Sequence, residues 1–329
     1  MQTVGTLSGE NSGSPNITIG KASIIYLSLA LMLSFYHFKT INLPFAPQRA
    51  EFHQGIIRGD FKSPYQYRVL APWLVELPSL IVGSVIDLSN ENRAMLVREV
   101  FYSLQRVVAL FLLFVVFHLY LLTWFRPDIA FAGTLLLAGL HLFTFRSYYF
   151  QPSSPLNLLF LTTGAWLMAR GEFKGWLYPL TIIGSLTRET FGLIVPMHLS
   201  FFGHKRTTLK HTVGLFLVWA GVQGALRGIF GMQPSFPSRP LSANFHEVLW
   251  PLFLFSLMWV IPLIGIRRLP SELRSMLWLF AMPLLFVNFI FGKVEETRLF
   301  LDLAIVLIPA TLFVLLGGEN GIQLSTADT

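Results

Sequence analysis

The stretch 176–202, WLYPLTIIGSLTRETFGLIVPMHLSFF, is apolar at both ends and carries Arg188 and Glu189 side by side at its centre. As one membrane-spanning helix it would hold both charges near mid-bilayer, at a cost of roughly 3 kcal/mol each on insertion scales. Both flanking loops are basic, and basic loops face the cytoplasm. The stretch therefore has to enter and leave on the same side. We predict two short helices, 175–186 and 190–202, which meet at the two charges.

Each of these helices is too short to cross a membrane. A helix of about 12 to 14 residues spans roughly 18 to 21 Å, against about 30 Å for the hydrocarbon core. The tip of the pair then lies just below the outer surface, in a cavity lined by water or protein, because irregular backbone is not tolerated against lipid.

The composition places the rest of the chain in the same class. Of 329 residues, 53% are hydrophobic and 12% charged, whereas soluble domains are about 25% charged. We expect an all-α polytopic integral membrane protein with about ten transmembrane or partly spanning helices. The apolar segments are 22–38, 69–86, 97–124, 129–145, 155–170, 175–186, 190–202, 210–229, 248–266, 275–291 and 299–316.

The domain organisation follows from these segments. We expect a disordered polar tail over 1–20, a single membrane domain over 21–318 and a short tail over 319–329. Within the domain, the first outer loop, 39–94, is expected to hold interfacial helices. The segment 69–86 is broken by proline, glycine and acidic residues, which favours a helix that does not cross the membrane, although a crossing helix stays open.

Loop charge gives the orientation. Four short loops hold nine basic and three acidic residues and are assigned to the cytoplasm. The basic residues are Arg126, Arg170, Lys174, Lys205, Arg206, Lys210, Arg267, Arg268 and Arg274. The opposite, outer face then collects both signs of charge and many tyrosines, which is typical of a site for a polar substrate.

Two further stretches carry candidate chemistry on that face. SPYQYRVLAPW at 63–73 brings tyrosines next to Arg68, and arginine binds phosphate in a bidentate manner. GKVEETRLFLDL at 292–303 spaces Glu295, Arg298 and Asp302 along one helical stripe. An aromatic belt at the membrane surface and a plain ion-pair stripe are the simpler interpretations of these two stretches.

Several kinds of site are not indicated. The chain has no cysteine, no H-x-x-x-H or H-E-x-x-H pattern, no G-x-S-x-G and no nucleotide-binding loop. We therefore predict no metal ligands and leave open whether a divalent cation assists catalysis. The net charge of +7 suits a protein facing anionic lipid, and nothing indicates nucleic acid.

Taken in order, these motifs resemble a known superfamily. A first helix and an acidic loop are followed by PYQYRVLAPWL, by TRET at 187–190 and by EETRLFLDLAIVLIP at 295–309. This pattern is similar to that of the GT-C glycosyltransferases, which use polyprenyl-phosphate sugars, and most resembles their bacterial mannosyltransferase-like branch. The resemblance implies a bacterial inner-membrane enzyme with an extracytoplasmic active face.

The resemblance also implies roles for individual residues. The catalytic carboxylate of the family lies in the first outer loop and best matches Glu51, with Asp60, His53 and Glu189 as alternates. Arg68, Arg188 and Arg298 match positions that surround the donor phosphate. The substrate-binding candidates on the same face are Tyr65, Tyr67, Arg146, Gln151, Glu189 and Glu295.

The implied reaction transfers a hexose such as mannose from a polyprenyl-phosphate donor to a lipid or glycan acceptor, with inversion. A carboxylate would take the proton of the acceptor hydroxyl, and arginines would stabilise the departing phosphate. Two alternatives stay open. The chain could be a transporter or flippase for a lipid-linked or anionic solute, with the two short helices as discontinuous elements. It could also be a non-enzymatic partner in cell-envelope assembly.

Overall fold

The computed structural model describes residues 18–85, 90–145, 152–171, 174–203, 206–235 and 241–317, almost all of them helical. The α-helices are α1 (Ile19–His37), α2 (Ala46–Arg58), α3 (Leu70–Gly83), α4 (Glu91–Leu121), α5 (Pro127–Phe143), α6 (Ser153–Arg170), α7 (Leu177–Ser185), α8 (Ile194–Phe202), α9 (Arg206–Phe230), α10 (Leu241–His246), α11 (Leu249–Phe255), α12 (Ile261–Ile264), α13 (Ser271–Met276), α14 (Met282–Phe291) and α15 (Ala304–Leu316). The shorter helical turns are η1 (Phe38–Asn42), η2 (Tyr65–Tyr67), η3 (Lys174–Trp176), η4 (Glu189–Leu193), η5 (Ser256–Trp259), η6 (Ile266–Arg268), η7 (Leu277–Ala281), η8 (Thr297–Leu299) and η9 (Leu301–Leu303). The expected all-α class is confirmed.

Helix α4 is the central helix of the bundle. Its 31 residues give it a length of about 46 Å, more than the roughly 30 Å of a bilayer core. The Asn90 side chain caps its start by accepting hydrogen bonds from the backbone of Asn92 and Arg93. Helices α1, α3, α5 and α6 all pack on it.

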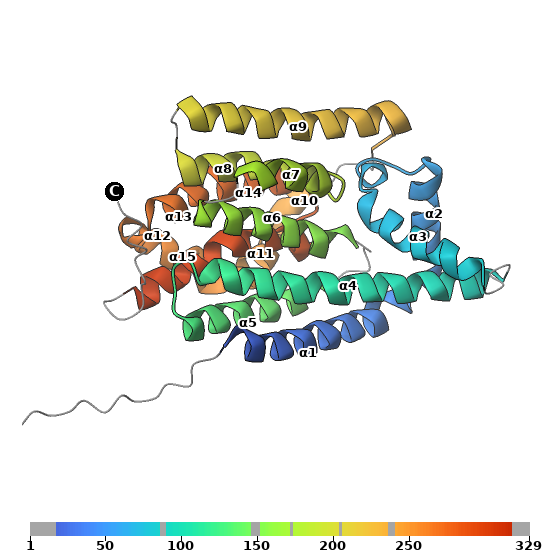
Figure 1. Cartoon of the computed structure of the whole chain (residues 1–329), viewed down its shortest axis with the longest axis horizontal. Helices are drawn as coiled ribbons and strands as arrows, with labels where there is room; N and C mark the ends of the chain where they lie inside the picture. Colours follow the sequence, from blue (N-terminus) through green and yellow to red (C-terminus); the bar gives the residue numbers. More distant parts are fainter. Residues whose placement is uncertain are drawn as a thin grey trace, which may run out of the picture.

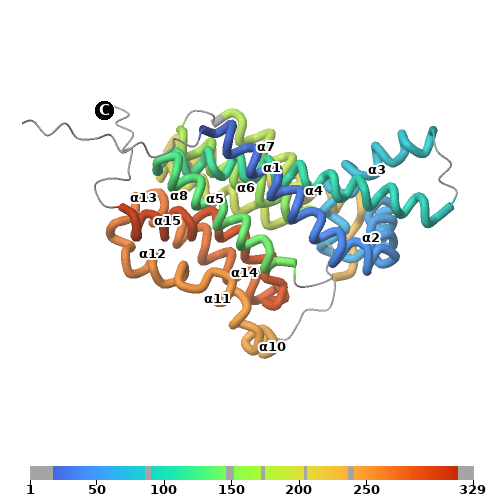
Figure 2. The backbone as a smooth tube through the Cα atoms, turned by 90° about the horizontal axis from the view of Figure 1, so that it is seen from below, coloured from blue at the N-terminus to red at the C-terminus, as the bar shows by residue number. Residues whose placement is uncertain are grey.

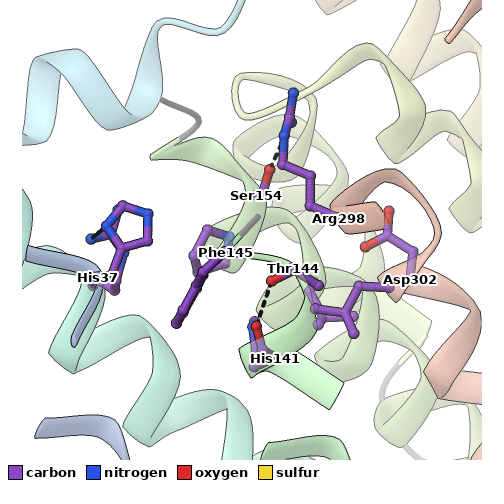
Figure 3. Close-up of a pocket in the computed structure, with 11 residues that line it drawn as sticks. His37, His141, Thr144, Phe145, Ser154, Arg298 and Asp302 are labelled. Atoms are coloured by element: carbon purple, nitrogen blue, oxygen red, sulfur yellow. Dashed lines mark hydrogen bonds between the residues drawn. The ribbon is translucent and has the colours of Figure 1, made fainter. Parts of the chain in front are cut away.

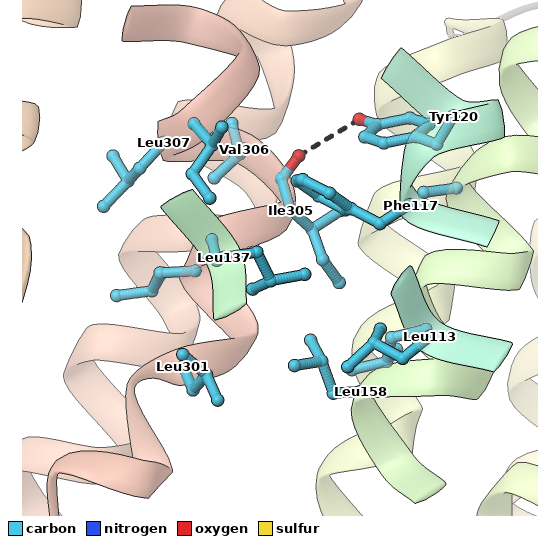
Figure 4. Packing of buried hydrophobic residues seen from close by; sticks show 14 of the residues in the cluster. Leu113, Phe117, Tyr120, Leu137, Leu158, Leu301, Ile305, Val306 and Leu307 are labelled. Carbon is cyan, nitrogen blue, oxygen red and sulfur yellow. Dashed lines mark hydrogen bonds between the residues drawn. The ribbon is translucent and has the colours of Figure 1, made fainter. Parts of the chain in front are cut away.

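The core lies between α4 and α15. Helix α15 is apolar on all sides and is enclosed by other helices (Figure 4). The Tyr120 hydroxyl donates a hydrogen bond of 3.1 Å to the Ile305 carbonyl, while Leu113, Phe117 and Leu137 fill the space between the helices. Figure 1 shows α1 and α9 on opposite edges of this bundle, and Figure 2 shows α10, α11 and α12 along another side.

The outer surface of the bundle is apolar. Large side chains such as Met32, Leu217 and Phe286 are more than half exposed, which is unusual for soluble proteins but expected against lipid. Five described helical segments are long and apolar enough to cross a membrane, which is compatible with a membrane protein. They cover Ile19–Asn42, Glu91–Leu121, Arg206–Phe230, Ser271–Phe291 and Thr297–Leu316.

The expected number of about ten spanning helices is therefore not supported. Several apolar segments form shorter pieces, because glycine, proline and polar residues interrupt them. The segment 248–266 breaks at Ser256, which has φ of 45°, so α11 and α12 are separate. Helix α5, with 17 residues, is also below the length of the five candidates.

The stretch 176–202 folds as two short helices, as predicted. Helices α7 and α8 have nine residues each, about 14 Å, and the turn η4 joins them. Arg188 and Glu189 therefore lie at the tip of a helix pair and not inside a spanning helix.

The bundle has two ends of different character (Figure 1). Helices α2 and α3 gather at one end of α4, which we call the α2–α3 end. The turns that carry Arg126, Arg170, Arg206 and Arg267 lie at the other, which we call the basic-loop end. This grouping is the one that the loop charges predict.

Helix α3 stays at the α2–α3 end. Its Ala71 packs near Ala109 of α4, and Val75 packs against Tyr102, so α3 runs outward beside the first half of α4. This arrangement agrees with the non-crossing interpretation of 69–86. At the chain start, α1 begins at Ile19, inside the tail expected over 1–20; residues 1–17 and 318–329 lie outside the described residues.

A buried ion pair joins α2 to α4. Arg49 donates from Nε and Nη2 to the two carboxylate oxygens of Glu99, at 2.8 and 2.7 Å. Both side chains are almost fully buried. A pair of this kind contributes little net stability when intact, but either partner left alone is an uncompensated buried charge.

We expect cysteines at Lys62 and Ser271 to label from opposite sides of the membrane, because these exposed residues lie at opposite ends of the bundle. The chain contains no other cysteine, so each single variant reports one position. Labelling with a membrane-impermeant maleimide, before and after permeabilisation, measures this. An Arg58→Cys variant should behave like Lys62→Cys, and labelling of all three from one side contradicts the arrangement.

Breaking the buried pair should destabilise the fold. Glu99→Leu leaves the Arg49 charge unpaired and should cost about 3–5 kcal/mol, whereas Arg49→Met/Glu99→Leu should restore most of the loss. Thermal unfolding in detergent measures both variants. Asp60→Asn, in the exposed Arg58–Asp60 pair, is the matched control and should leave the midpoint unchanged. Equal stability of Glu99→Leu and the control contradicts the prediction.

Candidate functional site

The turn between α7 and α8 is held in place from two sides. The Leu70 backbone N–H, at the start of α3, donates to the Leu186 carbonyl at 3.1 Å. The Gln223 side chain of α9 donates to the Ser185 carbonyl at 2.9 Å. Because α3 and α9 fix the turn, its two charged side chains have defined positions at the α2–α3 end.

Glu189 forms an ion pair with Arg68, 121 residues earlier in the chain. Arg68 Nε donates to one carboxylate oxygen at 3.1 Å and Nη2 contacts the other. The guanidinium also lies over the Tyr65 ring, 4.8 Å from its centre. Burial alone would raise the pKa of the Glu189 carboxyl, but the charge and hydrogen bonds of Arg68 hold it below its ordinary value. Glu189 is therefore a weak base.

Arg188 has no such partner. Its side chain is 2% exposed, and neither Nε nor Nη1 finds a hydrogen-bond acceptor among the described residues. The carboxylates of Asp302 and Glu189 are near enough to act electrostatically, as are the cations of Arg68 and Arg298. A buried guanidinium without acceptors is costly in an empty protein, so it indicates a place for an anionic ligand.

Asp302 is fixed by a short chain of polar groups. Asn157 Nδ2 donates to Asp302 Oδ2 at 3.0 Å, across 145 residues of sequence. The Thr187 hydroxyl lies 3.4 Å from Asn157 Oδ1, next to Arg188 in the sequence. All three side chains are buried. This series of polar contacts connects α6, the turn before η4, and η9.

A small cavity opens beside Asp302 (Figure 3). Its volume is about 40 Å³, enough for two or three waters or for hydroxyl and phosphate oxygens. Side chains from α1, α4, α5, α6 and the η8–η9 region meet around it. The lining residues are His37, Arg106, His141, Thr144, Phe145, Ser154, Pro155, Leu158, Arg298, Leu301 and Asp302.

Arg106 is a second arginine without a carboxylate partner. Its Nη1 lies 2.5 Å from His37 Nδ1 and 3.4 Å from Asn42 Oδ1. A guanidinium only donates and an amide oxygen only accepts, so His37 Nδ1, which also lies 2.9 Å from Asn42 Oδ1, can hydrogen-bond to only one of these two groups at a time. In the described part of the chain, no carboxylate forms an ion pair with Arg106.

Arg298, the third cation, is already paired. It contacts the Glu296 carboxylate through Nη2 and lies 3.4 Å from the Ser154 hydroxyl. Arg106, which lines the cavity, and Arg188, which lies near Asp302 outside the lining, are thus without an ion pair among the described residues, against the single free carboxylate of Asp302. The cluster carries one excess positive charge, which favours an anion.

The structure brings several predicted site residues together. Arg68, Arg188, Glu189 and Arg298, which are far apart in the sequence, form one buried electrostatic cluster. Tyr65 contributes its ring to Arg68. Although Arg188 and Glu189 are adjacent in the sequence, only Glu189 pairs with Arg68, and Arg188 has no ion-pair partner among the described residues.

The predicted catalytic residues of the first outer loop lie elsewhere. Helix α2 buries the face that carries Arg49 and His53, whereas Glu51 and Asp60 are exposed. His53 bonds to Glu76 at 2.8 Å and to the Tyr102 hydroxyl at 2.6 Å, and burial lowers its pKa despite the nearby carboxylate. None of these three loop residues lines the cavity.

The remaining predicted substrate-binding residues differ in their surroundings. The Tyr67 hydroxyl donates to the Gly231 carbonyl at 2.9 Å and its ring lies under Arg227, so Tyr67 joins the loop to α9. Glu295 is half-buried beside Glu296. Arg146 and Gln151 lie outside the described residues.

Three residues that line the cavity, and Asn157 beside Asp302, had no predicted role. Asp302 was placed only in a charged stripe, and Arg106, His141 and Asn157 were absorbed into apolar segments. The signal that could have found them is the presence of polar or ionisable groups inside otherwise apolar helices, which in membranes often marks function. Among the described residues, no group of three or more His, Asp or Glu side chains is placed to bind a metal ion.

Replacing Arg188 separates a structural role from a ligand-binding one. Because the Arg188 side chain makes no hydrogen bond in the described structure, Arg188→Met should keep or raise the unfolding midpoint of the ligand-free protein. Farnesyl phosphate should stabilise the original chain, by about 2.7 kcal/mol at 100 times its Kd, but not the variant. Thermal unfolding with and without farnesyl phosphate measures both effects. A loss of stability as large as that of Glu99→Leu, or equal ligand shifts, contradicts the prediction.

No family model, no characterised protein and no solved structure matches this chain. The geometry of the α2–α3 end and the sequence resemblance are therefore the observations that bear on function.

Proposed function

We propose that the chain is a membrane glycosyltransferase. It would take a hexose such as mannose from a polyprenyl-phosphate donor and transfer it, with inversion, to a lipid or glycan acceptor. The α2–α3 end would face the outer side of a bacterial inner membrane, since the basic-loop end has the charge of a cytoplasmic face.

The observation that carries this proposal is the buried guanidinium of Arg188. Its side chain has no hydrogen bond among the described residues, and it lies close enough to Asp302 and Arg298, which line the cavity, to interact with them electrostatically. Guanidinium groups bind phosphate oxygens well, and a phosphate would supply the acceptors that Arg188 lacks. Each bond to a charged group is worth about 1.5–3 kcal/mol.

An apolar groove supports a lipid-linked donor. It has a volume of about 380 Å³ and opens on the surface formed by α11, η5 and α14. Phe300 at its floor is two residues from Arg298, so a prenyl chain in the groove would bring its phosphate toward the arginines. The lining residues are Val248, Pro251, Leu252, Trp259, Met282, Leu285, Phe286, Phe289 and Phe300.

The chemistry asked of the arginines is electrostatic. Attack of the acceptor oxygen at the sugar C1 breaks the bond to the phosphate, which leaves with an additional negative charge. Arg188 and Arg106 would stabilise this charge in a site from which bulk water is excluded, where such interactions are strong.

A transporter or flippase for a lipid-linked anion is the second candidate. The observation in its favour is the discontinuous pair α7–α8, because broken helices with charged tips form substrate sites in transporters. The two candidates differ in whether a covalent bond of the lipid is broken.

The experiment that separates them is a transfer assay with the purified chain in liposomes. Polyprenyl-phosphate mannose, labelled in the sugar, is supplied with a mixed lipid acceptor extract, and the products are separated by chromatography. We expect label to move to the acceptor and polyprenyl phosphate to be released. Arg188→Met should lower kcat/KM about 10- to 100-fold, in line with the loss of one or two charged contacts.

Arg126→Met, at the exposed basic-loop end, is the matched control and should retain full activity. Movement of intact labelled lipid between leaflets, without release of polyprenyl phosphate, would support the transporter instead. Neither transfer nor movement with any polyprenyl-phosphate sugar would remove both candidates.

A further inference from the structure

Asp302 is the one carboxylate that lines the cavity within the described part of the chain. It lies in η9, immediately before the buried helix α15, and its side chain is 2% exposed. Figure 3 shows it on the cavity wall together with His141 and Arg298. A carboxylate in this position would touch whatever polar group enters the cavity.

The geometry leaves one of its oxygens open to a ligand. Oδ2 accepts the hydrogen bond from Asn157 at 3.0 Å, while Oδ1 has no partner among the described residues. Asn157 in turn lies near the Thr187 hydroxyl, so the carboxylate has a fixed orientation. A general base needs both features, a held side chain and a free oxygen.

The other buried carboxylates at this end are already engaged by arginines. Glu99 pairs with Arg49, Glu189 with Arg68, and Glu296 with Arg298. An ion pair with arginine favours the ionised form and weakens the carboxylate as a base. Asp302 has no arginine within ion-pair distance in the described structure, although the Arg188 charge is nearby.

We infer that Asp302 is the catalytic base of the transfer reaction; this inference rests on the proposed function. The acceptor hydroxyl would give its proton to Asp302 Oδ1 while its oxygen forms the new bond to the sugar C1. The bond from C1 to the phosphate oxygen breaks, and its electron pair leaves with the polyprenyl phosphate. Arg188, beside Asp302, is placed to stabilise that leaving group.

Asp302→Asn tests this assignment, because it keeps the size of the side chain and the contact with Asn157. In the transfer assay, kcat should fall about 100- to 10,000-fold while the KM for the donor changes less than threefold. Added formate should restore part of the rate of Asp302→Ala by supplying a carboxylate, an effect that a purely structural role would not produce. Asp128→Asn, in the exposed basic-loop turn, is the matched control.

If the original chain transfers sugar and Asp302→Asn retains kcat within threefold, the inference is wrong and the proposed function stands. Loss of kcat in Glu51→Gln or His141→Gln, with Asp302→Asn active, also overturns it. If the original chain transfers no sugar, the inference falls with the proposed function. Should Asp302→Asn fail to fold, Asn157→Ala decides: a tenfold or larger loss of kcat with unchanged donor KM supports the inference, and unchanged kcat refutes it.

Discussion

The cost of burying charge is the constraint on which this structure depends. An ionised side chain inside an apolar bundle loses its hydration and has to recover that free energy from a partner. Along the α2–α3 end, arginines meet carboxylates supplied by other elements, as Arg49 meets Glu99 and Arg68 meets Glu189. The first pair holds α2 against α4, and the second joins the loop before α3 to the α7–α8 turn.

The candidate site is the place where buried charged groups lack an ion-pair partner. Arg188 and Arg106 are buried without an ion pair, and Asp302 is buried with only an amide as its partner. A fold selected only for stability would replace such groups by apolar ones, often at no loss. Arg106 and Asp302 line one cavity, and Arg188 is close enough to Asp302 to act on it electrostatically. This is the physical reason to place ligand chemistry there and not at the exposed carboxylates of α2.

Much of the fold followed from local patterns. Apolar segments predicted the all-α class, and the basic loops predicted the helix pair α7–α8, because charge and hydrophobicity act over single segments. The number of spanning helices was overestimated, since an apolar segment of adequate length also describes helices that break, as at Ser256, or that stay within the bundle. The three arginines that the resemblance implies, Arg68, Arg188 and Arg298, lie near one another, whereas its carboxylate, Glu51, lies on the exposed face of α2.

The sequence by itself determined the class of the protein, the two ends of the bundle and the position of Arg188 and Glu189 at the tip of two short helices. Only the tertiary structure decided which charges are paired. Glu189 and Arg68 are 121 residues apart, and Asp302 and Asn157 are 145 apart, so no local pattern relates them. Pairing depends on how the helices pack, and packing decides which carboxylate is neutralised by an arginine and which keeps an oxygen free.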